Sequence, residues 1–118
     1  MEDEMSKYML ILKGGDYEKF SPAEMQDIIE EFFQWTDDLK SKGTHVSSDE
    51  LNEKSKHIRL EKDDLIVTDG PFPETKEVIG GYYVVMAEDE KEAIEVSQGC
   101  PHLRYNGIIE LHEVIQNE

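Results

Sequence analysis

The stretch Tyr82-Tyr83-Val84-Val85-Met86 consists entirely of apolar and aromatic residues. A second run of the same kind, Tyr8-Met9-Leu10-Ile11-Leu12, lies near the start of the chain. Short apolar runs of this length are typical of strands. Because a strand points successive side chains to opposite faces of its sheet, each run presents apolar side chains to both faces. The two runs therefore predict two strands that need apolar cover on both sides.

Two helices are predicted around these strands. The sequence Ser21-Pro22-Ala23-Glu24 is typical of a helix start, because its serine can cap, its proline needs no amide partner and its glutamate can close a capping box. This helix is expected to end near Gly43. Asp89 and Glu92 form a similar D-x-x-E pattern for a second helix, which is expected to stop before Pro101.

The remaining segments complete an α+β pattern. Four further strands are predicted, two of them paired as a hairpin around Lys62-Asp63-Asp64: His45–Leu51, His57–Leu60, Leu65–Thr68 and Ile108–Ile115. The order β-α-β-(β-β)-α-β predicts a ferredoxin-like, split βαβ fold, with an antiparallel sheet and both helices on one face.

This architecture leaves one face of the sheet without helices. That face would carry alternate residues of the strand Tyr82–Met86. A contiguous apolar surface of this kind is unusual on a soluble monomer. We therefore expect a homodimer whose two sheets face each other. A pocket lined by apolar and aromatic side chains at the sheet edge would accompany it.

Composition sets further bounds. The 118 residues fit one domain, with residues 1–7 as a tail and residues 8–118 as the folded unit. The net charge of −16 disfavours binding to nucleic acid. With the single cysteine Cys100, no disulfide within the chain is expected. No membrane span and no basic signal-like start are seen, so a cytoplasmic protein is expected. No metal or redox cofactor is implied.

The segment Asp69-Gly70-Pro71-Phe72-Pro73-Glu74-Thr75-Lys76 is the best candidate for a site. Asp69 is typical of a turn, but a carboxylate at a strand end can also act as a general base, with Phe72 beside it in a pocket. Glu74 and Lys76 share one side of an extended segment. They form either a surface ion pair or a site in which Lys76 holds a substrate carboxylate and Glu74 moves a proton.

Other candidates lie elsewhere in the sequence. His102 can shuttle protons near neutral pH, or it can be structural. Cys100 is interpreted as a small buried hydrophobic residue. The hydroxyl groups of Tyr8 and Tyr82 are candidates to reach the pocket. The other histidines have no partner spacing and are interpreted as structural: His45, His57 and His112.

The string from Leu65 to Glu77, followed by Gly80-Gly81-Tyr82-Tyr83 and later by Cys100-Pro101-His102, resembles the YCII-related proteins of the DGPF type. The resemblance implies a dimeric α+β barrel in a bacterial, cytoplasmic protein of mostly unknown function. Some relatives are encoded beside alternative sigma factors or fused to them, so a sigma-factor association is implied by the resemblance alone.

A few enzymes of the broader YCII-like group act on chlorinated or lactone-like small molecules. They use a histidine on the first helix and an aspartate before a proline after the second helix. In this chain the first helix carries Phe32, Phe33 and Trp35 in the corresponding region, and Cys100 precedes Pro101. That His–Asp pair cannot be carried over.

The leading hypothesis is a homodimer that binds a small organic molecule beside the Asp69–Lys76 segment. Chemistry of the lyase or isomerase type is one reading, with Asp69 as the base and Lys76 or His102 as its partner. A non-catalytic module that senses a ligand or regulates transcription is the alternative, and a purely structural dimer is a third reading. Whether the protein is an enzyme is left open.

Overall fold

The computed structural model describes residues 5–70 and 78–116, and this part of the chain forms six strands, two α-helices and one 3-10 helix. In chain order they are β1 (Ser6–Gly14), α1 (Pro22–Ser41), β2 (His45–Glu50), β3 (Ser55–Glu61), β4 (Asp64–Gly70), β5 (Ile79–Ala87), α2 (Glu90–Ser97), the 3-10 helix η1 (Pro101–Tyr105) and β6 (Gly107–Glu113). Four strands form an antiparallel sheet in the order β2-β5-β1-β6, and β3 pairs with β4 separately.

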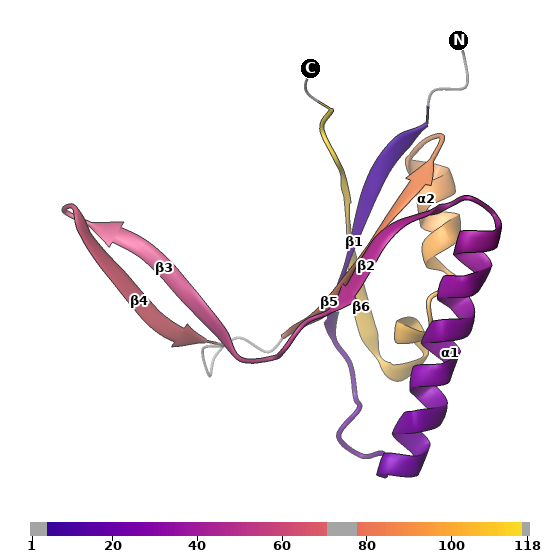
Figure 1. Cartoon of the computed structure of the whole chain (residues 1–118), viewed down its shortest axis with the longest axis horizontal. Helices are drawn as coiled ribbons and strands as arrows, with labels where there is room; N and C mark the ends of the chain where they lie inside the picture. Colours follow the sequence, from indigo (N-terminus) through magenta and orange to yellow (C-terminus); the bar gives the residue numbers. More distant parts are fainter. Residues whose placement is uncertain (1–4, 71–77, 117–118) are drawn as a thin grey trace.

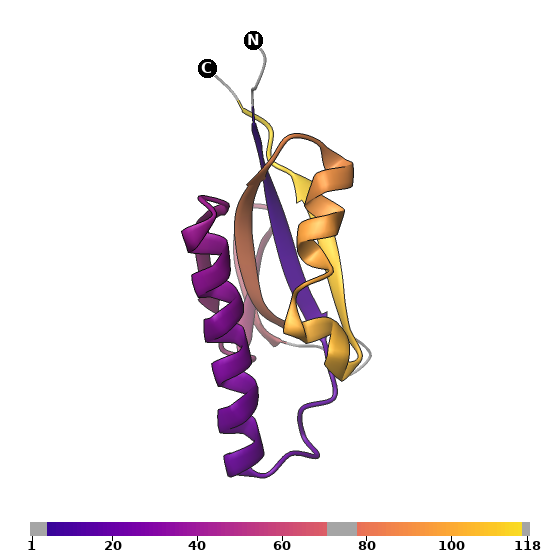
Figure 2. The ribbon, with the colours of Figure 1, turned by 90° about the vertical axis from the view of Figure 1, so that its right-hand side faces the viewer.

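The two apolar runs form the central strands β1 and β5. They pair antiparallel, with Tyr8 opposite Val85 and Leu10 opposite Tyr83. Both helices lie on one side of this sheet, as Figure 2 shows with α1 and α2 in front of the strands. The predicted α+β, ferredoxin-like arrangement is therefore confirmed.

The helix ends follow the sequence signals. The backbone N–H of Glu24 donates to the hydroxyl of Ser21 over 3.1 Å, and the Glu24 carboxylate accepts from the N–H of Ser21 over 2.8 Å. This capping box satisfies two amide groups that would otherwise lack partners at the start of α1. Gly43 follows α1 with a φ of +74°, a conformation that glycine adopts without strain. At the start of α2, Asp89 accepts from the N–H of Glu92 over 2.9 Å.

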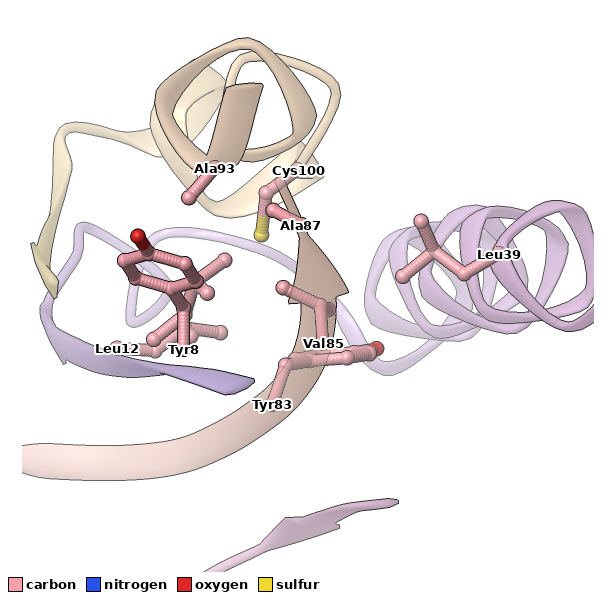
Figure 3. Close-up of a cluster of buried hydrophobic side chains, with 9 residues drawn as sticks. Tyr8, Leu12, Leu39, Tyr83, Val85, Ala87, Ala93 and Cys100 are labelled. Carbon is pink, nitrogen blue, oxygen red and sulfur yellow. The ribbon is translucent and has the colours of Figure 1, made fainter. Parts of the chain in front are cut away.

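The hydrophobic core lies between the helices and the sheet (Figure 3). Leu10 and Val85 are fully buried, and Cys100 fills the space beside them with 1% exposure. The Trp35 ring of α1 packs edge-on against the Tyr83 ring, with 4.7 Å between the two ring centroids. Neighbours on β1, β5, α1 and α2 complete the cluster: Tyr8, Leu12, Leu39, Ala87 and Ala93.

The opposite face of the sheet is the open face. Because side chains alternate along a strand, Met9 and Ile11 of β1 point there, as do Val84 and Met86 of β5. No helix of the described residues covers this face. The expectation that the helices would cover only one side is therefore confirmed.

The hairpin β3–β4 leaves the body of the molecule. Figure 1 shows it projecting from the sheet on the side away from α1. Its turn uses Lys62 and Asp63 with positive φ values of 49° and 73°, which suit a two-residue hairpin loop. The radius of gyration is 16.7 Å, whereas a compact chain of this length has about 13 to 14 Å. In the described residues, no helix has the length and apolar character needed to cross a membrane.

Leu10→Ala tests the position of the core. Leu10 has no exposed surface, so we expect the free energy of unfolding to fall by about 2 to 5 kcal/mol, measured by urea denaturation. Leu103→Ala is the control, because Leu103 is 43% exposed, and its loss should stay well below that of Leu10→Ala. Equal losses in the two variants would contradict this location of the core.

Candidate functional site

The structure describes four of the seven predicted site residues: Tyr8, Asp69, Tyr82 and His102. The other three lie in the segment 71–77, outside the described residues: Phe72, Glu74 and Lys76. The four described residues lie on β1, β4, β5 and η1, and each has its own surroundings.

Asp69 lies on β4 directly opposite Lys56 of β3, whose ammonium group donates to its carboxylate. The Asp69 side chain is 82% exposed. Ion pairs this exposed contribute little to stability because solvent screens them. Among the described residues, Lys56 is the partner that the geometry gives to Asp69, and its role as a general base remains a prediction.

Tyr8 and Tyr82 point to opposite faces of the sheet. Tyr8 is 4% exposed and lies below α2, where burial first, and then the carboxylates of Glu113, Asp89 and Glu90, raise its pKa. A cavity of about 160 Å³ lies beside it, lined also by Leu111. Ligand pockets usually measure at least about 300 Å³, so this cavity is small for an organic ligand.

Tyr82 lies on the open face. Its hydroxyl group donates to the carboxylate of Asp49 on β2 over 2.9 Å, and this hydrogen bond raises the pKa of Tyr82. The strand register places Asp49 directly opposite Tyr82. The pair gives the open face a polar border toward β2.

His102 is buried with 3% exposure, and both ring nitrogens are occupied. Nε2 lies 2.8 Å from the carbonyl oxygen of Lys13. A carbonyl only accepts, so Nε2 carries the hydrogen and donates it. In the neutral ring, Nδ1 then accepts from the hydroxyl of Tyr17 over 2.7 Å. Burial lowers the pKa of His102, which favours this neutral form.

Two glycines leave room for the imidazole ring of His102. A side chain on Gly107 would begin 2.2 Å from the imidazole, and one on Gly15 would begin 3.1 Å from it. The ring therefore joins the end of β1 to the start of β6 through two glycine positions. This geometry favours the structural alternative for His102, since neither nitrogen is free to exchange a proton.

The surroundings of Cys100 also indicate a structural role. Burial raises the pKa of its thiol to about 11, so the thiol stays protonated near neutral pH. In the described part of the chain, no group of three or more His, Cys, Asp or Glu side chains is arranged to hold a metal ion.

A polar cluster on the open face combines Lys13 of β1 with Glu110 and His112 of β6. The Lys13 ammonium donates to one Glu110 oxygen over 2.7 Å, and His112 Nε2 donates to the other over 2.6 Å. The hydrogen bond from Lys13, followed by that from His112, lowers the pKa of Glu110. Glu110 therefore stays ionised and holds the imidazole ring in one orientation. This Lys-Glu-His cluster is absent from the sequence prediction, although Glu110 and His112 are two apart on a predicted strand.

The Lys-Glu-His cluster lies near Val78 and Ile79, the first residues that the structure describes after the predicted site segment. The N–H of Gly14 donates to the carbonyl of Val78 over 3.0 Å, and Ile79 lies opposite Lys13 in the β1–β5 register. Val78, Ile79 and the cluster therefore share one end of β1, although 97 residues separate Lys13 from Glu110.

The pH dependence of stability tests the state of His102. Burial holds its folded pKa below the ordinary value of 6.5, so the unfolded chain takes up a proton first as the pH falls. We expect the free energy of unfolding to decrease below about pH 6.5, by at most about 1.4 kcal/mol per pH unit. His102→Gln should lose that part of the slope between pH 7.5 and 5.5, measured by urea denaturation at each pH.

Burial also lowers the pKa of His45, so its contribution has the same sign. His45 is present in both the parent protein and His102→Gln, so the difference between their two pH slopes isolates the contribution of His102. Tyr17→Phe is a second variant, because it keeps the imidazole and leaves Nδ1 without a donor. It should show a shallower slope than the parent protein. An unchanged slope in His102→Gln would rule out a neutral, buried imidazole.

Residues 6–118 match the family model of the YCII-related domain, which covers nearly the whole chain. No curated protein matches the chain. A family match of this extent includes both helices, the four-stranded sheet and the hairpin. The chain belongs to the YCII-related domain family.

Proposed function

We propose that this protein is a bacterial, cytoplasmic homodimer of the DGPF type that binds a small organic molecule beside the Asp69–Lys76 segment. Acid–base chemistry of the lyase or isomerase type follows at that site. The observation that carries the proposal is the Lys-Glu-His cluster on the open face, next to the residues that follow the segment. It joins a histidine, an ionised carboxylate and an ammonium group within hydrogen-bond distance.

The three side chains have complementary chemical roles in the proposal. Histidine is the side chain whose ordinary pKa lies nearest neutral pH, so His112 exchanges a proton with the bound molecule. Glu110 orients the ring and stabilises its protonated form. An ammonium group has three hydrogens to donate, so Lys13 holds Glu110 and also binds an anionic oxygen of the ligand. Proton abstraction next to a carbonyl group produces such an oxygen.

A second copy of the chain supplies the enclosure that this chemistry needs. In one chain the His112 side chain is 54% exposed and that of Glu110 is 42% exposed. Water at this level of access weakens electrostatic stabilisation. Two open faces packed together would exclude water from the cluster and bury the apolar side chains around it, including Met9, Ile11 and Met86.

Ile108→Lys tests the contact between open faces. Ile108 lies opposite Lys13 on that face and is 49% exposed. A lysine there would place a charge in the contact, so we expect the dimer to dissociate at least tenfold more readily in analytical ultracentrifugation. Ile94→Lys is the matched control, because Ile94 on α2 is 47% exposed and lies on the helix side. A dimer that tolerates Ile108→Lys as well as Ile94→Lys would argue against the contact.

Native mass spectrometry of the gently purified protein tests the ligand. We expect the mass of a dimer plus a small bound molecule. Glu110→Gln should remain dimeric. The fraction of dimers that carry the bound molecule should fall by at least about nine-tenths, since the substitution removes the charge that orients His112. Glu113→Gln is the matched control, because it changes the same strand on the opposite face. Asp69→Ala should stay folded, since its ion pair with Lys56 is exposed.

The outcomes separate the readings. Loss of the bound mass in Glu110→Gln and Asp69→Ala, but not in Glu113→Gln, supports a site formed by the cluster and the segment. A bound molecule that is released chemically unchanged favours the alternative, a ligand-sensing or regulatory module linked to sigma factors. A dimer with no bound mass, and no thermal shift with a panel of small hydroxy and keto acids, would contradict ligand binding at this face.

A further inference from the structure

The hairpin β3–β4, here called the arm, is an amphipathic ribbon. Residues directly opposite each other in an antiparallel pair share one face, and alternate residues share it along each strand. Ile58 is opposite Val67, and Leu60 is opposite Leu65. These four side chains form a continuous apolar face, with exposures of 67%, 51%, 68% and 65% respectively.

The reverse face of the arm is largely polar. Arg59 and Glu61 alternate with the apolar residues on β3, and their side chains form an ion pair at 3.1 Å. His57 and Thr68 are opposite each other on this same face. The division between the two faces is the pattern of a strand pair that packs on one side and meets water on the other.

The described part of the chain supplies nothing for the apolar face to pack on. The residues of the buried core come from the sheet, the helices and the residue before η1, and none of those described belongs to β3 or β4. A two-stranded hairpin without packing partners is at best marginally stable in water. Figure 1 shows the arm extending away from the rest of the molecule. The apolar face is therefore suited to a partner outside the chain.

Position points to a second copy as that partner. The arm, residues 55–70, carries three Lys and Arg residues and four Asp and Glu residues, so it holds only one of the sixteen net negative charges of the chain. Because the arm is nearly neutral, it can approach an identical acidic body with little repulsion. The arm and the open face also lie on the same side of the molecule, away from the helices (Figures 1 and 2).

We propose that the arm packs its apolar face against a second copy of this chain, so that two copies hold each other through exchanged arms. In a dimer with two-fold symmetry, each arm packs on the other copy. One symmetry operation therefore covers both apolar faces. The inference does not depend on the ligand site. It shares the dimer with the proposed function but assigns part of the contact to residues far from the open face.

The test compares two double variants of β3 in analytical ultracentrifugation. Ile58→Thr with Leu60→Thr removes apolar side chains and keeps the strand propensity of the arm. We expect it to raise the dimer dissociation constant on the order of a hundredfold. Arg59→Thr with Glu61→Thr changes the alternate residues on the polar face, leaves the net charge unaltered, and should leave the constant within about threefold.

Hydrogen exchange provides a second measurement. The amides of β3 and β4 should be protected in the parent protein at dimer concentrations and lose that protection on dilution. They should exchange rapidly in the apolar double variant, while the amides of β1 and β5 stay protected. This result keeps the test valid if the variant remains partly dimeric through the open faces.

Two results would overturn the proposal. The first is equal dissociation constants for the two double variants and the parent protein. The second is rapid exchange of the arm amides in a parent protein that is dimeric. If Ile108→Lys dissociates the dimer while both double variants leave it intact, the open faces pack together and the arm plays no part. If the apolar double variant alone dissociates it, the arm holds the dimer and the open-face contact fails.

Discussion

The unequal cover of β1 and β5 is the constraint on which the rest of the structure depends. These two strands lie side by side and carry apolar side chains on both faces. On one face, Leu10 and Val85 are fully buried below α1 and α2. Burial of apolar surface is the main favourable contribution to folding, and here it fixes the register of the central pair. The other face has the same apolar character and no helix of the described residues above it.

The polar groups of the molecule divide according to that same asymmetry. On the helix side, both ring nitrogens of His102 are hydrogen-bonded and burial lowers the pKa of the ring, because a charged imidazole is costly where water is excluded. On the open side, Lys13, Glu110 and His112 retain contact with solvent and carry their hydrogen bonds at the surface of the sheet. One histidine thus serves the packing of the chain, while the other is exposed on the open face.

Local patterns in the sequence were enough to identify the helices, the strands and the ferredoxin-like fold. The capping box at Ser21 and the hairpin turn at Lys62 depend only on residues close in the chain. The site was harder to predict because its contacts join distant residues. The ring of His102 is oriented by Tyr17 and Lys13, which are 85 and 89 residues away. The direction in which the hairpin leaves the sheet has no signal in its own residues.

The lysines in and around β3 also have a consequence for the newly synthesised chain. A single chain exposes a strand pair whose aliphatic side chains and open backbone edges can recruit strands of unrelated or misfolded proteins. Lys54, Lys56 and Lys62 flank the aliphatic residues, and such charged gatekeepers oppose fibrillar stacking by repulsion between like strands. These lysines therefore protect the exposed arm from irreversible aggregation.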